Sequence, residues 1–326
     1  MQNARSILLH LCLPAVFLLQ TSCTTPTATG PTRCSLWIDM YSGEPAAYED
    51  VLEDLAKARV VYIGERHTLQ RHHDVQARIV EDLIARDLPL VLALEQLEGF
   101  QQPILDEYNT GQIDFDELAR KTDWAQRWSN YEQYRPIVEA AHQAGMPILA
   151  LNAKAETVRQ VARQGLANLA PELRAELPAD INLDDPMYEN HVRRLLMVHA
   201  MANKDMTRRM FQAQVARDET MAARLCNFLA SHAHEPPTAV VLCGAVHAAH
   251  GMGIPSRVRR RMPHLNDRII VLSESGDLEL SAREKAMARA VTITHEDLRA
   301  LNRPLADYLR VTTLRPASPE LADNQN

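Results

Sequence analysis

The hydrophobic positions of the chain fall into short unbroken runs that alternate with longer amphipathic segments. Runs of four to six apolar residues are short enough to be buried strands, and they are rich in the aliphatic residues that strands favour. They predict core strands at residues 60–63, 89–94, 148–151, 239–243 and 269–272, and an edge strand at 308–312. Because the strands alternate with helices, the sequence favours an α/β fold, with three α/β/α layers around a mostly parallel central sheet.

Helical periodicity accounts for the segments between these strands. A short lead-in and an amphipathic helix precede the first core strand, and apolar residues at helical spacing predict another helix over residues 73–86. Helical patterns also occupy residues 100–144 and 153–234, and three prolines break the second of them. The sequence therefore predicts a large helical insertion between the third and fourth core strands.

The first residues have the pattern of a secretion signal. Arg5 precedes an apolar run that is too short to span a bilayer comfortably. Small residues before Cys23 and a Thr/Pro/Gly-rich tether after it resemble a bacterial lipoprotein signal, in which that cysteine carries lipid. Thr24 is not the aspartate that usually retains such proteins in the inner membrane. We therefore expect a periplasm-facing protein with a lipid anchor in the outer membrane; ordinary cleavage to a soluble periplasmic protein is the alternative.

The chain thus divides into a signal peptide, a flexible tether, one α/β domain and a disordered polar tail, at residues 1–23, 24–35, 36–315 and 316–326. Its net charge of −7 argues against nucleic acid as a partner, because phosphate binding needs clustered Lys and Arg. The one dense basic run, residues 257–261, is interpreted as a solvated helix face. Three cysteines follow the signal, an odd number that implies no disulfide framework.

Polar groups follow several of the predicted core strands. The first strand runs into Gly64-Glu65-Arg66-His67 and the fourth into Gly244-Ala245-Val246-His247, which gives two copies of Gly-x-x-His. Glu95 and Asn152 follow the second and third strands. In a mainly parallel sheet these strand ends meet at one edge, where α/β sheets bind their ligands. The two carboxylates and two imidazoles, Glu65, Glu95, His67 and His247, either hold a divalent metal or serve as general acids and bases.

A second candidate feature lies on one face of a predicted helix. Gln214, Asp218 and Met221 recur at spacings of three and four, so an otherwise apolar face carries an amide and a carboxylate. Buried polar groups need partners. Either this helix covers the site and presents Gln214 and Asp218 to it, or the two side chains bond to a neighbouring helix.

With these motifs the chain resembles the ChaN family of haem-binding uptake proteins, within the superfamily of Tiki-type metalloproteases and erythromycin-esterase-like enzymes. The matching pieces, in chain order, include Gly64–His67 with His72-His73 and Gln76, Leu94-Glu95-Gln96, Trp128 to Pro136, Ala150–Asn152, Ala213-Gln214, Asp218, and Gly244–His247 running into Gly251–Pro255. The resemblance implies a periplasm-facing α/β protein that binds haem or a related tetrapyrrole, often as a lipoprotein in iron uptake. In the protease relatives, the twin Gly-x-x-His and a glutamate form a metal site. His250 departs from the family pattern, and we expect it at the surface.

Haem requires an apolar slot, an axial ligand to the iron, and groups that meet its propionates. Tyr134 and Tyr131 are the candidate phenolate ligands, and Tyr134 is favoured because Arg135 lies beside it. His72, His73 and His142 are the alternative ligands, with Gln214 and Asp218 as further candidates for the haem site.

The sequence leads to one favoured function and a rival. The favoured function is a haem-binding, non-enzymatic envelope lipoprotein in haem or iron uptake. The rival is a metal-dependent peptidase or esterase that holds zinc or manganese at Glu65, His67, Glu95 and His247, with Glu65 or Glu95 as the catalytic glutamate. A structural envelope lipoprotein with a degenerate site is a third reading. The sequence leaves open whether the protein is a homodimer.

Overall fold

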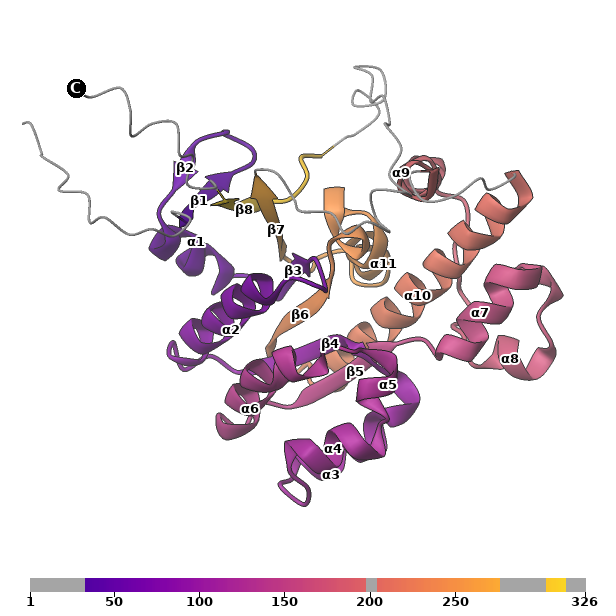
Figure 1. Cartoon of the computed structure of the whole chain (residues 1–326), viewed down its shortest axis with the longest axis horizontal. Coiled ribbons are helices and arrows are strands. Elements are labelled where there is room, and N and C mark those ends of the chain that lie inside the picture. The colour runs from indigo at the N-terminus through magenta and orange to yellow at the C-terminus, as the bar shows by residue number, and fades with distance from the viewer. Residues whose placement is uncertain (1–32, 198–203, 276–302, 315–326) are drawn as a thin grey trace, which may run out of the picture. The chain divides into compact units, whose positions relative to one another are not determined.

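The computed structural model describes residues 33–197, 204–275 and 303–314 (Figure 1). Residues 33–315 form one compact unit. The expected signal peptide, Cys23 and the tail after residue 315 lie outside the described residues. No helix in the described part of the chain is both long enough and apolar enough to cross a membrane.

The strands are β1 (Arg33–Asp39), β2 (Pro45–Ala46), β3 (Val60–Glu65), β4 (Leu90–Glu98), β5 (Ile148–Asn152), β6 (Thr238–Gly244), β7 (Asp267–Ser275) and β8 (Tyr308–Leu314). The α-helices are α1 (Tyr48–Leu55), α2 (Gln70–Ile84), α3 (Gln102–Asn109), α4 (Phe115–Lys121), α5 (Trp124–Arg127), α6 (Arg135–Gln143), α7 (Ala155–Gln164), α8 (Pro171–Ala175), α9 (Pro186–Met197), α10 (Lys204–Ser231) and α11 (Gly253–Arg261). Helices α7 to α10 form the insertion expected between the third and fourth core strands.

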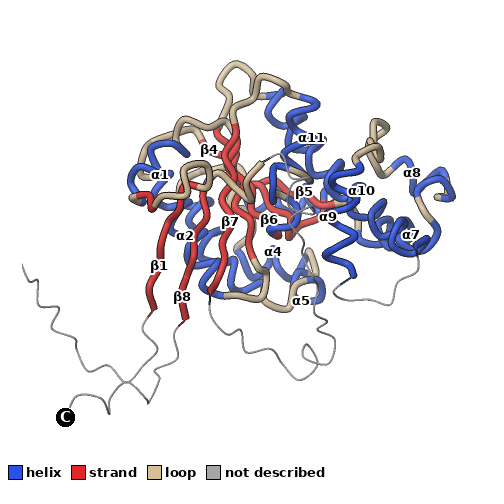
Figure 2. The backbone as a smooth tube through the Cα atoms, turned by 90° about the horizontal axis from the view of Figure 1, so that it is seen from above, coloured by secondary structure: helices blue, strands red, loops and turns tan. Residues whose placement is uncertain are grey.

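The strands form one sheet in the order β2-β1-β8-β7-β3-β6-β4-β5 (Figure 2). β3 lies at its centre and pairs in parallel with β6 on one side and β7 on the other. β4 joins β6 and β5 in the same direction. The predicted α/β fold with a mostly parallel sheet is confirmed.

The N-terminal and C-terminal strands correct two expectations. β8 is not an edge strand, because it pairs in parallel with β7 and antiparallel with β1. β1 occupies part of the segment expected to be only a lead-in to the first helix. Strand order depends on contacts between distant parts of the chain, which the local apolar pattern does not encode.

Prolines begin two of the helices in the insertion. Pro171 and Pro186 each stand at the first position of a helix, α8 and α9, where a missing backbone N–H costs nothing. The expected breaks at these residues are therefore helix starts. The segment over residues 100–144 is likewise divided, into the four helices α3 to α6 and the short 3₁₀ turns η1 (Gly99–Gln101) and η2 (Tyr131–Tyr134).

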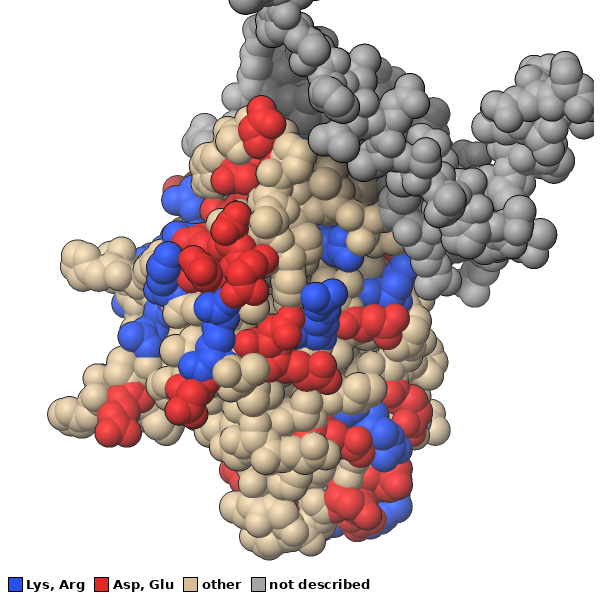
Figure 3. Space-filling view, turned by 90° about the vertical axis from the view of Figure 1, so that its left-hand side faces the viewer, with Lys and Arg blue, Asp and Glu red and all other residues tan. Residues whose placement is uncertain are grey.

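The basic run on α11 is not a solvated face. The side chain of Arg257 is only 3% exposed, and its guanidinium lies over the ring of Tyr188. Arg260 and Arg261 form ion pairs with the buried carboxylate of Glu219, at 2.8 and 2.7 Å. The run therefore binds α11 to α10. On the face shown in Figure 3, Lys and Arg side chains are interspersed with Asp and Glu.

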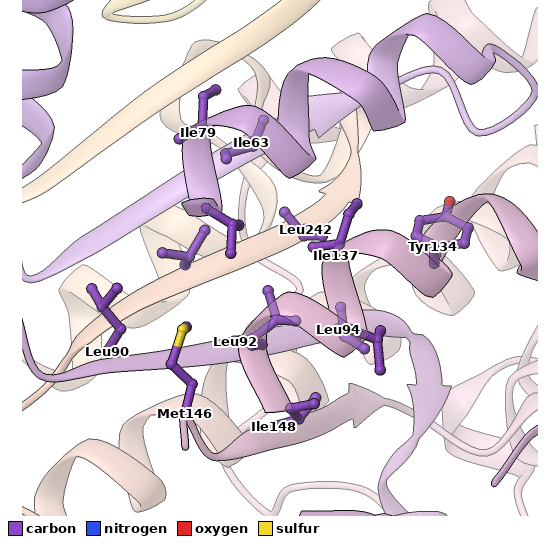
Figure 4. Close-up of a cluster of buried hydrophobic side chains, with 14 of the residues drawn as sticks. Ile63, Ile79, Leu90, Leu92, Leu94, Tyr134, Ile137, Met146, Ile148 and Leu242 are labelled. Carbon is purple, nitrogen blue, oxygen red and sulfur yellow. The ribbon is translucent and has the colours of Figure 1, made fainter. Parts of the chain in front are cut away.

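Alternate residues of the central strands point to opposite faces of the sheet, which creates two hydrophobic cores. Val61 and Ile63 of β3 lie in a core with α2 and α6, part of which Figure 4 shows. Val60 and Tyr62 point the other way, into a core with α10 and α11. Each fully buried aliphatic side chain stabilises the fold by about 1.5–3 kcal/mol. Helices thus cover both faces and leave the carboxyl edge of the parallel strands for polar groups.

Candidate functional site

The two Gly-x-x-His motifs end neighbouring parallel strands. β3 and β6 pair with Glu65 opposite Gly244, so both motifs leave the sheet at its carboxyl edge. A Cβ atom on Gly244 would lie 2.7 Å from Nε2 of His67. A Cβ atom on Gly64 would lie 2.9 Å from Cα of Ala245. Each motif therefore requires its glycine so that the other motif can pack against it.

Glu65 is the centre of one half of the site. Its buried carboxylate accepts hydrogen bonds from Nδ1 of His67 at 2.8 Å and from the amide of Gln96 at 3.2 Å. Nδ1 of His73 lies 2.9 Å from the second carboxylate oxygen, and the Tyr134 hydroxyl donates to the first. Burial by itself would raise the pKa of Glu65, but the bonds from His67 and His73 lower it to about 2. Glu65 is therefore ionised at neutral pH.

His247 is the centre of the other half. Its Nε2 lies 3.2 Å from Oε1 of Glu95, and its Nδ1 lies 2.5 Å from Oδ1 of Asp218. Burial by itself would lower the pKa of His247, but the charges of Glu95 and Asp218 raise it to about 10. Because ionised carboxylates only accept hydrogen bonds, both ring nitrogens carry protons. His247 is therefore an imidazolium held between two carboxylates.

Glu95 is positioned by backbone as well as by His247. It lies within β4, where the pairing with β5 shifts register, an irregularity that redirects side chains. Its second carboxylate oxygen accepts the backbone N–H of Gly244 at 2.7 Å. Burial would raise the pKa of Glu95, but the His247 charge holds it well below its usual range. Asn152, at the end of β5, donates to the backbone carbonyl of Glu95 at 2.9 Å.

Helix α10 covers the His247 half of the site. The Gln214 amide lies 3.0 Å from Nδ1 of His247, and Asp218 pairs with the same nitrogen. The second oxygen of Asp218 accepts the Tyr188 hydroxyl of α9 at 2.6 Å. Both readings of this helix face therefore hold together: the two side chains face the site, and Asp218 also bonds to a neighbouring helix.

The chain matches the protein-family model described as "Haem-binding uptake, Tiki superfamily, ChaN" over residues 51–258. The chain belongs to this family. All of Glu65, His67, Glu95, Asp218 and His247 lie within the matched residues.

Two solved structures align with this ChaN-family chain. The structure of ChaN of Campylobacter jejuni, described as showing cofacial haem binding, aligns with a TM-score of 0.63 and 19% identity, over 85% of this chain and 96% of that one. A mutant of the erythromycin esterase EreC, in its open conformation, aligns with a TM-score of 0.43 and 14% identity, over 74% and 77%. The first alignment shows a shared fold, and the TM-score of the second is too low to support an argument. The sequence has no match among curated proteins.

The four imidazoles near this site in the ChaN-family fold differ in how many ring nitrogens are engaged. His73 uses both, one with Glu65 and the other with the backbone carbonyl of His67 at 3.0 Å. Burial by itself would lower the pKa of His73, but the hydrogen bond and charge of Glu65 raise it. His72 accepts the backbone N–H of Arg66 at 2.9 Å through Nδ1, and burial lowers its pKa to about 4. Both of these rings are almost fully buried.

His67 is the imidazole of this set that reaches the surface. Its side chain is 33% exposed, and the Trp128 ring packs against it edge-on, with centroids 4.7 Å apart. Nδ1 is held by Glu65, and Nε2 is the ring nitrogen outside that bond. Nε2 lies 4.0 Å from the nearest Glu95 oxygen, beyond hydrogen-bonding distance.

The two candidate tyrosines do not occupy the positions expected of phenolate ligands. Tyr134 is fully buried and its hydroxyl donates to Glu65. Burial and the Glu65 charge hold the pKa of Tyr134 far above its usual range, so it stays a neutral hydrogen-bond donor. Tyr131 packs on the rings of Phe115 and Trp124 instead of entering the site. In this structure the Tyr134 hydroxyl orients Glu65, and its role as an iron ligand stays a prediction.

The same four side chains are the candidate metal ligands. Glu65, His67, Glu95 and His247 do come together, but as the carboxylate–imidazole pairs Glu65–His67 and Glu95–His247, and Nε2 of His67, 4.0 Å from Glu95, lies outside these pairs. The described residues contain no group of three or more His, Cys, Asp or Glu side chains placed to hold a metal ion. The alternative of a resident zinc or manganese ion therefore gains no support from this arrangement.

Three residues that hold the site together were not singled out by their chemistry in the sequence. Gln96 donates to Glu65, Tyr188 donates to Asp218, and Asn130 donates to the backbone carbonyl of His67. Gln96 follows Glu95 directly, so its place at a strand end was the available signal. Tyr188 and Asn130 reach the site only through helix packing, and the local sequence carried no signal for either. His250 lies away from these contacts, with Nδ1 3.2 Å from the carbonyl of Arg303.

Proposed function

We propose that this protein binds haem at the carboxyl edge of its sheet and that His67 is the axial ligand. Membership of the ChaN-type family supports haem as the ligand. The observation that carries the position is that the His67 side chain is 33% exposed and its Nε2 lies outside hydrogen-bonding distance of Glu95, whereas His72, His73 and His247 are buried. An imidazole whose other nitrogen bonds to a carboxylate is a common iron ligand, because the carboxylate fixes the tautomer and ring orientation.

The residues around His67 fit such a group. Trp128 offers an aromatic face to an apolar macrocycle. Arg66, which directly precedes His67, is exposed, and its guanidinium is suited to a propionate. Glu65 holds Nδ1 of His67 and is itself held by Tyr134. When bound, haem supplies the iron; the protein supplies the ring nitrogen, keeps its tautomer and covers the macrocycle.

We further propose that haem binding serves uptake in the bacterial envelope. The sequence pattern before Cys23 supports lipid attachment at that residue and an outer-membrane location facing the periplasm. Expressed in a Gram-negative host, the protein should carry lipid on Cys23 and fractionate with outer membranes, and Cys23→Ala should release it or block processing. An unmodified N-terminus elsewhere in the mass spectrum contradicts the anchor. Light scattering with and without haemin tests whether the protein is a homodimer.

The metal-dependent hydrolase is the second candidate, and the protonation of the site weighs against it. A general base works best with a pKa near the working pH. With no metal bound, the pKa of Glu65 is lowered to about 2 and that of His247 is raised to about 10, so in this state neither exchanges a proton at neutral pH. A hydrolase would require these pairs to be broken when substrate binds.

Haemin titration separates the two functions. The chain from residue 24 onward, which contains the whole compact unit, should bind haemin stoichiometrically and show a strong Soret band. Elemental analysis of the same sample reports zinc and manganese. If haemin binds no better than to an unrelated protein, while a divalent metal co-purifies and Glu65→Gln abolishes a peptidase or esterase activity, the hydrolase is the correct function.

A further inference from the structure

A pocket of about 610 Å³ opens on the side of the sheet opposite to the His67 site. β3, β6 and β7 are adjacent and parallel, so the loops that enter them gather at one edge, the amino edge. Arg59 precedes β3, Pro236 precedes β6 and Asn266 precedes β7, and all three line the pocket. The pocket is therefore separate from the site at the carboxyl edge.

The walls of this amino-edge pocket are tied to each other by hydrogen bonds. The backbone N–H of Arg59 donates to the carbonyl of Asn266 at 2.8 Å. The Arg59 guanidinium donates to the carbonyl of Pro236, and the Asn266 amide donates to the carbonyl of Lys57 at 3.2 Å. Three entry loops are thus linked through two side chains, which makes the pocket preformed.

Its lining combines apolar and basic groups. Leu229, Met262 and Leu265 belong to its apolar wall, and these residues also pack on the core between the sheet and α10. Lys57, Arg59, Arg261 and His264 supply the basic groups. The described residues that line the pocket include no Asp or Glu, although the whole chain carries a net charge of −7. The local charge is therefore opposite to that of the protein.

The basic groups are not equally available. Arg261 is compensated by Asp180 at 2.8 Å and by Glu219 at 2.7 Å. Arg59 is partly used by the Pro236 carbonyl. Lys57 and His264 are exposed, and neither forms an ion pair within 4.0 Å among the described residues, although the charge of Lys57 helps to lower the pKa of Asp54. An anion in this pocket would therefore meet Lys57 and His264 first.

We propose that the amino-edge pocket binds a small amphipathic carboxylate, with its apolar body against Leu229 and Met262 and its carboxylate at Lys57. The volume lies within the range of about 300–1,000 Å³ found for sites that enclose small molecules. An apolar wall with a few placed charges selects a ligand with an apolar body and one anionic end. This site does not depend on haem binding at His67.

A displacement assay with a fluorescent fatty acid, 11-(dansylamino)undecanoic acid, tests the proposal on the chain from residue 24 onward. The probe should bind saturably, and decanoate should displace it at least tenfold better than decanol, which has the same chain without the charge. Ala233→Trp fills the pocket from an exposed position, and Lys57→Glu reverses the charge; each should raise Kd at least tenfold. Lys121→Glu is the matched control, the same charge change on helix α4, and should leave Kd unchanged.

The outcomes separate this site from the haem site. Absence of saturable binding overturns the proposal, as does equal binding to Ala233→Trp or equal displacement by decanol. Haemin should not displace the probe. If haemin does displace it and Ala233→Trp also lowers haemin affinity, the pocket is a haem site, and the fatty-acid proposal fails while haem binding itself stands.

Discussion

Two neighbouring carboxylates on helix α10, Asp218 and Glu219, are both fully buried but have different partners. Asp218 pairs with the imidazole of His247 and the hydroxyl of Tyr188. Glu219 pairs with the guanidinium groups of Arg260 and Arg261, and it accepts the backbone N–H of Asn182 at 3.0 Å. One side chain faces the functional site, and the other joins α10 to α11 and to the connection between α8 and α9.

The difference lies in which partners can change charge. A guanidinium is always protonated in proteins, so the Glu219 pairs persist at every physiological pH. An imidazole can lose its proton, so the charge of His247 depends on Asp218 and Glu95. We infer that the Glu219 cluster is structural and that the Asp218 pair keeps the site in one protonation state.

The largest expected effect is on the structural cluster. Glu219→Gln leaves Arg260 and Arg261 without their buried counter-charge, and breaking a buried pair in this way typically costs about 3–5 kcal/mol. We expect a loss of at least about 3 kcal/mol in the free energy of unfolding, measured by urea denaturation. Haemin affinity of the folded protein should be unchanged. A stable Glu219→Gln protein with altered haemin binding would reverse the assignment of the two carboxylates.

A smaller effect on stability is expected at the other carboxylate. Asp218→Asn keeps a hydrogen-bond acceptor for Tyr188 but removes one of the two charges that hold the proton on His247. We expect a loss of about 1–3 kcal/mol, the usual range for a buried polar group left without its partner. The decisive readout is the NMR titration of His247, whose pKa should fall from about 10 toward its ordinary value. An unchanged midpoint means that Asp218 does not set the charge of His247.

A third effect, spread over several pH units, is the pH dependence of the wild-type stability. The pKa of Glu65 is lowered from 4.5 to about 2, so its contribution is complete above pH 4.5 and is lost as the pH falls toward 2. The pKa of His247 is raised from 6.5 to about 10, so its contribution is complete below pH 6.5 and is lost as the pH rises toward 10. The pKa of His72, by contrast, is lowered from 6.5 to about 4, so the unfolded chain binds this proton more readily and stability falls as the pH drops below 6.5. Maximum stability should therefore lie near about pH 6.5. Glu219→Gln should keep this profile, whereas Asp218→Asn should flatten its alkaline side; equal profiles for all three proteins would contradict the account.

The sequence predicts the central sheet because strands that are buried on both faces consist of unbroken apolar runs. The same logic places Glu65, Glu95 and His247 at one edge, since parallel strands share their direction. It does not predict that β8 is internal, because strand order is set by distant contacts. Arg257 was expected in water but is buried against Tyr188. Its ion-pair partners, Asp185 and Glu219, are distant in the sequence, so the local pattern could not reveal them.

At the functional site, too, the sequence could not predict side-chain positions that depend on contacts between distant residues. A tyrosine beside an arginine suggested Tyr134 as a ligand, but its hydroxyl points to Glu65. Side-chain direction depends on the turn at η2 and on the packing of Trp124, with which Tyr134 stacks. The choice of one histidine as the candidate axial ligand depends on the hydrogen-bond partners of each ring. The spacing of the histidines in the sequence does not reveal those partners.

The measurement that tests the account most directly is the haemin spectrum of ligand variants, on protein that remains folded by circular dichroism. His67→Ala should lose the axial bond, which changes the Soret band and weakens haemin affinity at least tenfold. Tyr134→Phe removes a hydrogen bond to Glu65 but no iron ligand, so its Soret position should stay close to that of the wild type, as should that of the control Tyr131→Phe. If His67→Ala keeps the wild-type spectrum while Tyr134→Phe changes it, the axial ligand is Tyr134 and the assignment of His67 is wrong.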